Sequence, residues 1–403
     1  MNLSFTDELL KLVPEGYRGV AFCKICENEL QKNKAWIEES YKTIVKLLSV
    51  MITKQASDID FGGERCLGRV WYRVFGRKHP ANDMGFYSVE EVTIMLLAIL
   101  QEDQREKLYE NKSIDFALSI KLIPGEKPIR FRGSVYFERS MLCANFRLIN
   151  QKLFSLLELG IPPQIEKRLN LKYEKSGLIL ITGITGSGKS STLDAIINMN
   201  NRDNDAHIIV LGNPIEFVHE SKKSLVTHRE VGEDVRSFQS GTIEALRQDP
   251  DIVVVGEMRD ASTMATVLEV TDSGHKVLTT LHTSSAVDSI HRIIAEFPPN
   301  EQDRIRHRLA DTLSVVISQK LVPNKVGKLT LAKEILSVNA SVQAAIRNNN
   351  LSEIFQMITE GKNKGMITMQ QDLFRLVKTG EITVETALNY SNNKKVMIRL
   401  LKY

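Results

Sequence analysis

The stretch Gly-Ile-Thr-Gly-Ser-Gly-Lys-Ser at 183–190 restricts the possible folds of this chain more than any other feature. It fits the pattern G-x-x-x-x-G-K-[ST], in which backbone N–H groups of a glycine-rich loop surround a phosphate at the start of a helix. An apolar run at 178–182 precedes it as a strand, and residues 191–197 follow it as a helix. A glycine-rich turn with a solvated lysine is the alternative, but it leaves both flanking elements unexplained. The stretch therefore predicts a nucleotide-binding strand–loop–helix unit.

The polar groups of this loop have expected partners. Lys189 reaches the β- and γ-phosphate oxygens, and the Ser190 hydroxyl takes Mg²⁺. The backbone N–H groups curl around the β-phosphate. The loop residues predicted to contact the nucleotide are Gly183, Thr185, Gly186, Ser187, Gly188, Lys189, Ser190 and Ser191. The predicted cofactors are therefore ATP and Mg²⁺.

The region around this loop alternates short apolar runs with helical stretches. The runs rich in β-branched residues lie at 178–182, 208–211, 252–255 and 277–281. Such continuous apolar strands are typical of a parallel sheet that is covered by helices on both faces. In sheets of this kind, ligands bind beyond the carboxyl ends of the strands.

Two side chains follow strands at that edge of the sheet. Glu257 emerges after the strand 252–255, whereas Asp249 and Asp251 precede the strand. Glu257 lies six positions after Asp251 along an extended chain, which is about 20 Å at ~3.3 Å per residue. Glu257 is therefore the acid of this segment that can approach the metal, partly through water. His282 follows the strand 277–281, where an imidazole can respond to the γ-phosphate, although a structural role suits it equally well.

The rest of the chain divides by pattern. Helical periodicity at 41–51 and 90–100, with strands expected at 56–61, 70–75, 129–137 and 145–149, indicates a small α+β domain. Gly160, Pro162 and Pro163 mark a linker. The expected organisation is an N-terminal extension at 1–40, the α+β domain at 41–150, a linker at 151–170, the nucleotide-binding core at 171–340 and a helical C-terminal part at 341–403.

Composition and charge exclude several classes of protein. The 403 residues carry 53 basic and 49 acidic side chains, so the net charge of +4 does not indicate a nucleic-acid partner. The first residues lack a basic signal-peptide region, and the longest apolar run, 92–100, is too short to span a bilayer. A cytoplasmic protein is expected. Cys23-x-x-Cys26 has no second pair nearby, so reduced thiols are favoured over a metal or redox site.

Several longer stretches match one family of motor proteins. They are Ala-Ser-Asp at 56–58, Phe-Arg at 131–132 and 146–147, Glu-Leu-Gly-Ile at 158–161, Glu-Phe-Val-His-Glu-Ser-Lys-Lys at 216–223, Ala-Leu-Arg-Gln-Asp-Pro-Asp at 245–251, Val-Gly-Glu-Met-Arg-Asp at 255–260, Thr-Leu-His-Thr at 280–283, Ile-Ser-Gln at 317–319 and Lys-Gly-Met-x-Thr at 364–368. From about Thr43 to Asn393 the chain resembles the PilT-like type IV pilus retraction ATPases of the bacterial secretion-ATPase superfamily.

The resemblance implies an α/β protein with a RecA-like P-loop NTPase domain, a smaller PAS-like α+β N-terminal domain and a helical C-terminal tail. It also implies a homo-hexamer on the cytoplasmic face of the inner membrane, which acts on a pilus platform protein and powers twitching motility. Glu257 matches the family's Walker B glutamate, and His282 matches its conserved histidine. Arg132 and Arg147 match the arginines that reach the phosphates on closure, where a guanidinium stabilises the charge that grows on the γ-phosphate. A salt-bridged strand arginine is the alternative for each.

The chain departs from the family at two places. Gly212-Asn213 stand where the family has Glu-Asp, and that glutamate is thought to polarise the attacking water. Residues 341–347 keep only Ile346-Arg347 of the family's Ala-Ile-Arg-Asn-Leu-Ile-Arg helix, which is associated with retraction. The first departure predicts slow hydrolysis, and the second leaves the direction of work open.

Three functions remain in competition. The chain is a working retraction motor with lowered hydrolysis, an ATP-binding structural subunit that assists an active paralogous ATPase, or a related type II or type IV secretion motor. A DNA translocase is disfavoured because the sequence contains no basic stripe and no DNA-reading module.

Overall fold

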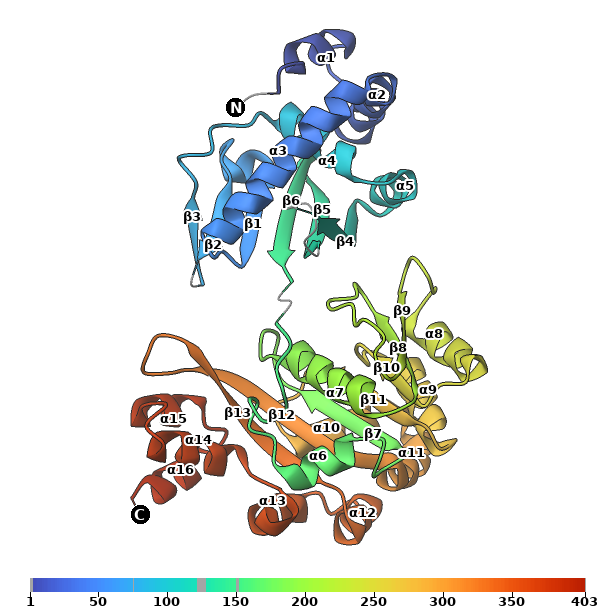
Figure 1. Cartoon of the computed structure of the whole chain (residues 1–403), viewed down its shortest axis with the longest axis vertical. Helices are drawn as coiled ribbons and strands as arrows, with labels where there is room; N and C mark the ends of the chain where they lie inside the picture. The colour runs from blue at the N-terminus through green and yellow to red at the C-terminus, as the bar shows by residue number, and fades with distance from the viewer. Residues whose placement is uncertain (1–2, 75, 122–127, 150–151, 403) are drawn as a thin grey trace. The chain divides into compact units, whose positions relative to one another are not determined.

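The computed structural model describes residues 3–74, 76–121, 128–149 and 152–402. They form two compact units, 1–151 and 152–403 (Figure 1). Residues 150 and 151, at the expected domain boundary, and Phe75, at the end of an expected strand, lie outside the described residues. Among the described helices, none combines the length and the apolar character that a membrane crossing requires.

The first unit is a mixed α+β domain built on an antiparallel six-stranded sheet with the order β3-β2-β1-β6-β5-β4. The strands are β1 Asp58–Gly62, β2 Trp71–Val74, β3 Arg77–Pro80, β4 Ser113–Ile120, β5 Ile129–Glu138 and β6 Met141–Leu148. The helices are α1 Thr6–Leu12, α2 Gly19–Lys32, α3 Lys34–Thr53, α4 Val89–Ile99 and α5 Glu102–Asn111, with a short 3₁₀ turn at Glu64–Cys66. Ile59 and Phe146 of the sheet share one core with Leu48 of α3 and Ile94 of α4. One face of the sheet is thereby packed against helices.

The first forty residues differ from the separate extension expected from the sequence. They form α1, α2 and the start of α3, and they supply Leu9, Cys26 and Trp36 to the core of the first unit. The Phe5 and Trp36 rings stack with their centroids 4.8 Å apart. All four cysteines of the chain are buried and free, and burial raises the pKa of the Cys23 thiol to about 12. The segment is therefore an integral layer of this unit.

Truncating a buried side chain in this segment should destabilise the first unit. Leu9 is 0% exposed, so Leu9→Ala is expected to lower the free energy of unfolding by about 2–5 kcal/mol through lost burial and the cavity left behind. Leu12 on the same helix is 52% exposed, and Leu12→Ala should stay within about 0.5 kcal/mol of the wild type. Denaturant titration of the two variants measures both values. Equal stabilities would show that α1 does not pack in solution.

The second unit is built on a seven-stranded sheet with the order β13-β12-β7-β11-β10-β8-β9. The strands are β7 Gly177–Thr182, β8 His207–Gly212, β9 Leu225–Glu230, β10 Ile252–Val255, β11 Lys276–Leu281, β12 Leu313–Pro323 and β13 Leu329–Ser337. Neighbouring strands are parallel except β12 and β13, which pair antiparallel. The expected parallel strands are all present, and β9, β12 and β13 extend the sheet beyond them.

Helices cover both faces of this sheet. Leu178 and Leu180 of β7 belong to one core, whereas Ile179 and Ile181 belong to the other, as the alternation of side chains along a strand requires. The first core takes helices α8 Phe238–Ala245, α9 Ala261–Asp272, α10 Ala286–Ala295, α11 Pro299–Thr312, α12 Ala340–Arg347 and α13 Ser352–Glu360, and the second takes α6 Pro163–Leu169 and α7 Lys189–Asp203. Short 3₁₀ turns lie at Leu246–Gln248 and Gly361–Lys364.

The segment expected as a linker is partly ordered on the second unit. Pro163 opens α6, because a proline at the first helical position loses no hydrogen bond. Ile161, Ile165 and Leu169 recur every four residues, and all three are buried in the core beside β7. From Leu156 onward the segment therefore packs as part of the nucleotide-binding unit.

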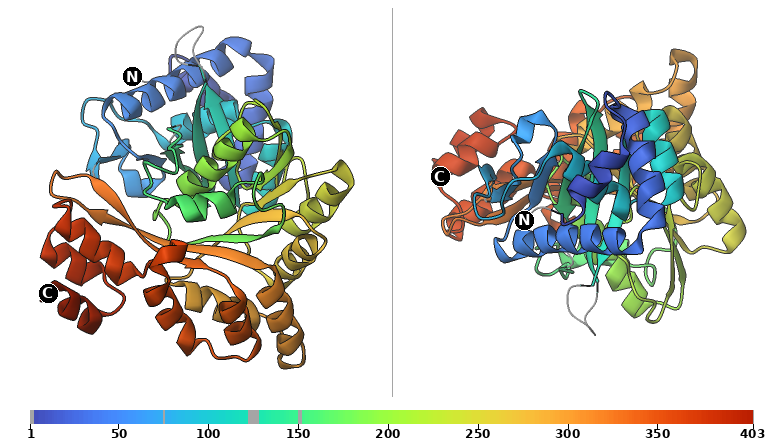
Figure 2. Two further views of the ribbon diagram at one scale, coloured as in Figure 1. Left: turned by 60° about the horizontal axis from the view of Figure 1, so that its bottom comes forward. Right: turned by 90° about the horizontal axis from the view of Figure 1, so that it is seen from above.

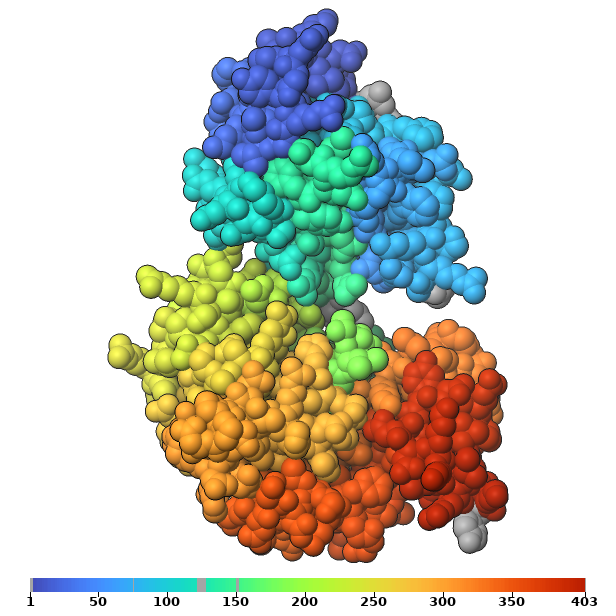
Figure 3. Space-filling view, turned by 180° about the vertical axis from the view of Figure 1, so that it is seen from behind, coloured from blue at the N-terminus to red at the C-terminus, as the bar shows by residue number. Residues whose placement is uncertain are grey.

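The C-terminal part is helical, as expected, and divides between two cores. Helices α12 and α13 join the core of the main sheet, whereas α14 Met369–Lys378, α15 Val384–Tyr390 and α16 Lys394–Leu401 pack around the β12–β13 hairpin. Val322 of β12 and Ala332 of β13 contribute to that smaller core. The three last helices gather beside the hairpin in both further ribbon views (Figure 2) and form one continuous surface patch of this unit (Figure 3).

Candidate functional site

The phosphate loop joins the carboxyl end of β7 to the start of α7. Gly186 has φ 79° and Gly188 has φ 87°, which lie in the left-handed region that favours glycine. A Cβ added to Gly183 would lie 2.5 Å from the carbonyl oxygen of Gln319. These glycines therefore permit a turn that is too tight for side chains and that exposes backbone N–H groups.

Strand β12 holds the loop from the side. The Gln319 amide Nε2 donates to the carbonyl oxygen of Ser187 at 2.9 Å, and Ser318 bonds Thr182 through their hydroxyls at 2.8 Å. Both contacts are buried, so they fix the loop at each of its ends. Residues 317–319 belong to the family resemblance, and no role was predicted for them. Their separation of more than 130 positions from the loop explains why local pattern did not reveal one.

The loop fits a nucleotide phosphate. Helix α7 begins at Lys189 with Gly188 as its N-cap, so no side chain caps the amino-terminal N–H groups that bind anions. The Ser187 hydroxyl is buried and has no hydrogen-bond partner among the described residues. Lys189 Nζ donates to the carbonyl oxygen of Gly183 at 2.8 Å, and burial lowers its pKa against the opposing effect of Glu257 and Glu216. An orphaned hydroxyl, open N–H groups and a cation are the groups that bind a phosphate.

A magnesium ion would depend on few protein ligands here. Within the described ranges, no three His, Cys, Asp or Glu side chains gather as a metal cage. Mg²⁺ at nucleotide sites is held by one or two protein oxygens together with the substrate phosphates. The residues predicted for that role are Ser190 and Glu257. Ser190 is the second residue of α7, and Glu257 follows β10.

Glu257 and His282 lie together beyond the carboxyl ends of the sheet. Glu257 follows β10, His282 follows β11, and the two strands are parallel neighbours. The carboxylate Oε2 of Glu257 lies 3.7 Å from His282 Nε2, and its Oε1 lies 2.6 Å from Arg259. At the opposite edge, Asp251 accepts the backbone N–H of His207 at 2.8 Å, as expected for an acid that precedes the strand. The sheet thus brings Glu257 and His282 together and keeps Asp251 away.

The histidine is held in its neutral form. Burial and the positive charge of Lys189 lower the pKa of His282, and Glu257 acts in the opposite direction. This direction favours the neutral ring at neutral pH, because the ordinary histidine pKa is already about 6.5. A neutral imidazole can either donate or accept a hydrogen bond, which suits a group that senses a nearby phosphate.

Strand β8 ends at Gly212 without an acid. The backbone N–H of Gly256 donates to the carbonyl oxygen of Leu211 at 2.9 Å, so this strand end lies directly beside the residue that precedes Glu257. A Cβ built on Gly212 would meet the terminal Cδ1 of Ile215 at 2.8 Å. The position is therefore adjacent to the predicted catalytic group, and a flexible side chain fills the space.

A buried pair behind the loop was not anticipated from the sequence. His219 Nε2 lies 3.0 Å from the Asp194 carboxylate on α7, and the backbone N–H of His219 donates to His228 at 3.0 Å. Burial raises the pKa of the Asp194 carboxyl against the opposing effect of His219. The pair ties the segment that follows Gly212 to the helix that begins with Lys189. The stretch 216–223 signalled it only through the family resemblance.

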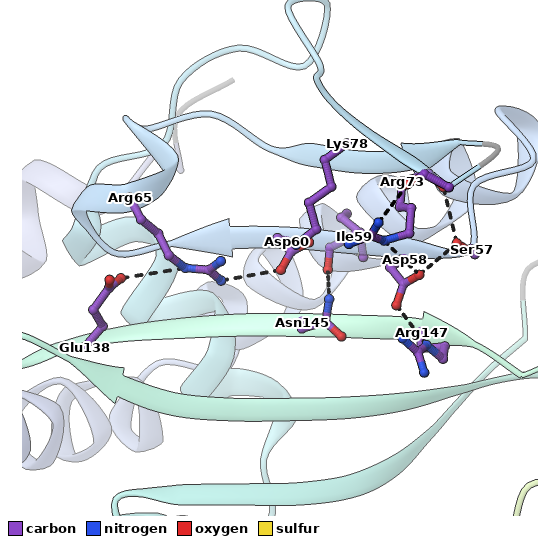
Figure 4. A network of polar contacts seen from close by, with 11 residues as sticks. Ser57, Asp58, Ile59, Asp60, Arg65, Arg73, Lys78, Glu138, Asn145 and Arg147 are labelled. Carbon is purple, nitrogen blue, oxygen red and sulfur yellow. Dashed lines mark hydrogen bonds and ion pairs between the residues drawn. The ribbon is translucent and has the colours of Figure 1, made fainter. Parts of the chain in front are cut away.

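Arg132 and Arg147 lie in the first unit, directly opposite each other on β5 and β6. Arg132 contacts Asp115 at 3.0 Å, and Arg147 contacts Asp58 at 2.8 Å (Figure 4). Both side chains are substantially exposed, at 41% and 56%. The structure therefore groups the two predicted arginines with each other, and each has a carboxylate partner.

The known proteins that this chain resembles are secretion-system and type IV pilus proteins. The sequence profile of a family described as Type II/IV secretion system protein matches residues 31–399. A twitching motility protein of Neisseria gonorrhoeae is 38% identical over 311 residues, which cover 77% of this chain and 81% of that protein. The type IV pilus ATPase PilU of Pseudomonas aeruginosa is 33% identical over 361 residues, covering 88% and 91%. A crystal structure of the pilus retraction motor PilT with bound ADP superposes with a TM-score of 0.78 at 36% identity, covering 88% of this chain and 99% of that chain.

Proposed function

The chain belongs to the type II/IV secretion system protein family, among its type IV pilus retraction ATPases, and from this membership we propose that it is a retraction motor subunit that binds Mg-ATP and hydrolyses it slowly. One observation carries the proposal. Lys189, Glu257 and His282 lie at the same sheet edge, and the neighbouring strand end at Gly212 lacks a side chain. The groups proposed to bind Mg-ATP are present, whereas Gly212 has no side chain that could orient the attacking water.

The chemistry assigned to the residues follows from their positions. The loop N–H groups and Lys189 bind the phosphates, and Ser190 with Glu257 holds Mg²⁺, partly through water. Bound Mg²⁺ supplies the positive charge that offsets the growing charge of phosphoryl transfer. His282, neutral and 3.7 Å from Glu257, orients that carboxylate and responds to the γ-phosphate. Arg132 and Arg147 reach the phosphates when the units close, and opening after hydrolysis releases them.

The assembly proposed is a homo-hexamer on the cytoplasmic face of the inner membrane. Its partner is the pilus platform protein, and its output is pilus disassembly.

The second candidate is an ATP-binding structural subunit that assists an active paralogous ATPase. Gly212 favours that candidate, because a subunit that only closes on nucleotide needs no group to polarise water. A related type II or type IV secretion motor remains the third candidate.

The decisive experiment measures nucleotide binding and steady-state phosphate release by the purified protein. We expect tight, Mg²⁺-dependent ATP binding. Turnover should fall at least ~10²-fold below the value of about 10 s⁻¹ that is typical of enzymes, because a water-orienting group is missing. Turnover near the typical value would contradict both the slow-motor and the structural-subunit versions. Failure to bind ATP would contradict the proposed function as a whole.

Arg132→Ala tests the arginine assignment separately. If Arg132 stabilises the transition state, its loss should slow hydrolysis by about 10²-fold or more, while ATP affinity falls by no more than about 10-fold. Arg77 is an exposed arginine on β3 of the same sheet, and Arg77→Ala is the matched control that should leave the rate alone. The same single-turnover assay serves both variants. Loss of ATP binding by Arg132→Ala would contradict the assignment.

A further inference from the structure

The face of the first sheet that points away from the helices carries two buried acids. Asp58 and Asp60 are two residues apart on β1, so their side chains share one face, while Ile59 and Phe61 enter the core on the other. Each aspartate is only 4% exposed. Buried carboxylates require partners, and Figure 4 shows cationic side chains beside both: Arg73 and Arg147 at Asp58, and Lys78 and Arg65 at Asp60.

Asp58 lies at the centre of a row that crosses the sheet in register. Its direct neighbours are Arg73 on β2 and Arg147 on β6. Beyond them, Lys78 pairs with Arg73, and Arg132 pairs with Arg147. Two arginines therefore flank the buried Asp58 carboxylate, one further cation lies beyond each of them, and the two arginines assigned to the phosphates form one end of the row.

The contact between Asp58 and Arg147 engages only one edge of the guanidinium. Asp58 Oδ1 accepts from Arg147 Nε at 2.8 Å, and Asp58 Oδ2 accepts from the Ser57 hydroxyl at 2.7 Å. Arg73 Nε lies farther away, 3.7 Å from Oδ2. The Arg147 side chain is 56% exposed. The acid thus holds the guanidinium through Nε while much of the side chain remains accessible to solvent.

We propose that Asp58 is a positioning residue that orients Arg147 for the γ-phosphate of ATP. The proposal rests on the proposed function, in which Arg147 reaches that phosphate. An arginine side chain has many rotamers, and a guanidinium already held through Nε loses less freedom when a phosphate binds its outer edge. The planar fork also fixes the direction of the two terminal N–H groups. Asp58 itself touches neither nucleotide nor metal.

Asp60 provides a matched control. It has the same burial, strand and face as Asp58, and it is paired with Lys78 at 2.8 Å and with Arg65 at 3.5 Å. Neither partner is one of the arginines assigned to the phosphates. Asp58→Asn and Asp60→Asn therefore remove equivalent buried charges, and only the first releases Arg147.

The experiment measures ATP and ADP affinity of the full-length protein in a Glu257→Gln background, where ATP is not consumed. We expect Asp58→Asn to lower the preference for ATP over ADP by about 10-fold, because misorienting one phosphate-binding group acts only on the γ-phosphate. Asp60→Asn should change the preference less than about 2-fold. Arg147→Ala should show the same loss as Asp58→Asn, and the double variant should lose nothing more, because both act through one contact.

Arg147→Lys provides a second test that can be used if Asp58→Asn does not fold. Arg147→Lys leaves a cation beside Asp58 but has no Nε edge to be oriented, so it should lose the preference for ATP to a similar extent. Equal losses in Asp58→Asn and Asp60→Asn would overturn the proposal, as would additive losses in the double variant. If Arg147→Ala loses the preference for ATP over ADP and Asp58→Asn keeps it, this inference is wrong and the proposed function stands. A wild-type protein that binds no ATP would instead overturn the proposed function and this inference together.

Discussion

Replacing Glu257 with glutamine is expected to lower single-turnover ATP hydrolysis by about 10²- to 10³-fold while ATP still binds. The carboxylate lies 3.7 Å from His282 and 2.6 Å from Arg259. It follows β10, which β11 separates from the strand that carries the phosphate loop. Glutamine keeps the size of the side chain and removes its negative charge. The loop and Lys189, to which phosphate binding is assigned, stay intact.

The fold should tolerate this change. The Arg259 side chain is 72% exposed, so water replaces its lost ion pair. Glu269 is an exposed acid on α9 of the same unit, and Glu269→Gln serves as the control with an unchanged rate. Release of labelled γ-phosphate under single-turnover conditions makes the comparison possible even when the wild type is slow. An unchanged rate in Glu257→Gln would remove Glu257 from the reaction.

Restoring the acidic pair is expected to act in the opposite direction. Gly212→Glu combined with Asn213→Asp should raise steady-state hydrolysis by about 10²-fold, the contribution typical of a general base. Gly212 has φ outside the left-handed region, so a side chain is compatible with its backbone. The Gly212 backbone lies beside the residue that precedes Glu257, because the Gly256 N–H donates to the carbonyl oxygen of Leu211.

Space at Gly212 is the practical difficulty. An added Cβ meets only the Cδ1 of Ile215 within 3 Å, and this atom is the end of a flexible side chain. Ile215→Val in the same background removes that methyl group and keeps the rest of the contact. Gly212→Gln with Asn213→Asp is the control, since it has the size of the restored pair without the base. If the acid and amide versions hydrolyse ATP at the same rate, the missing acid does not explain slow turnover.

The nucleotide loop and the sheet edge were predictable because their signals are local. Gly188-Lys189 at a strand–helix junction and Glu257 after four apolar residues each follow from a few neighbouring positions. Strand β9 was missed because Leu225–Glu230 is a largely polar edge strand. The contact between Asp58 and Arg147 joins residues 89 positions apart, so it depends on strand order and register. No pattern within either strand specifies that pairing.

The structure of the first forty residues also depends on long-range contacts that local sequence patterns do not specify. Their helices bury Leu9 and Leu30 against a core most of whose members follow later in the chain. Charged residues separate these apolar positions, so the segment reads as solvent-exposed until its partner surface is known. Tertiary burial decided the structure here, as it commonly does for amphipathic helices.

Strand β12 gives the molecule a mechanical connection. Gln319 bonds the phosphate loop at Ser187, and Val322, three residues further along, is buried among the last three helices. The neighbouring β13 reinforces the connection, because the backbone N–H of Lys333 donates to Asp372 on α14 at 2.9 Å. The phosphate loop and the C-terminal helices therefore rest on the same paired strands.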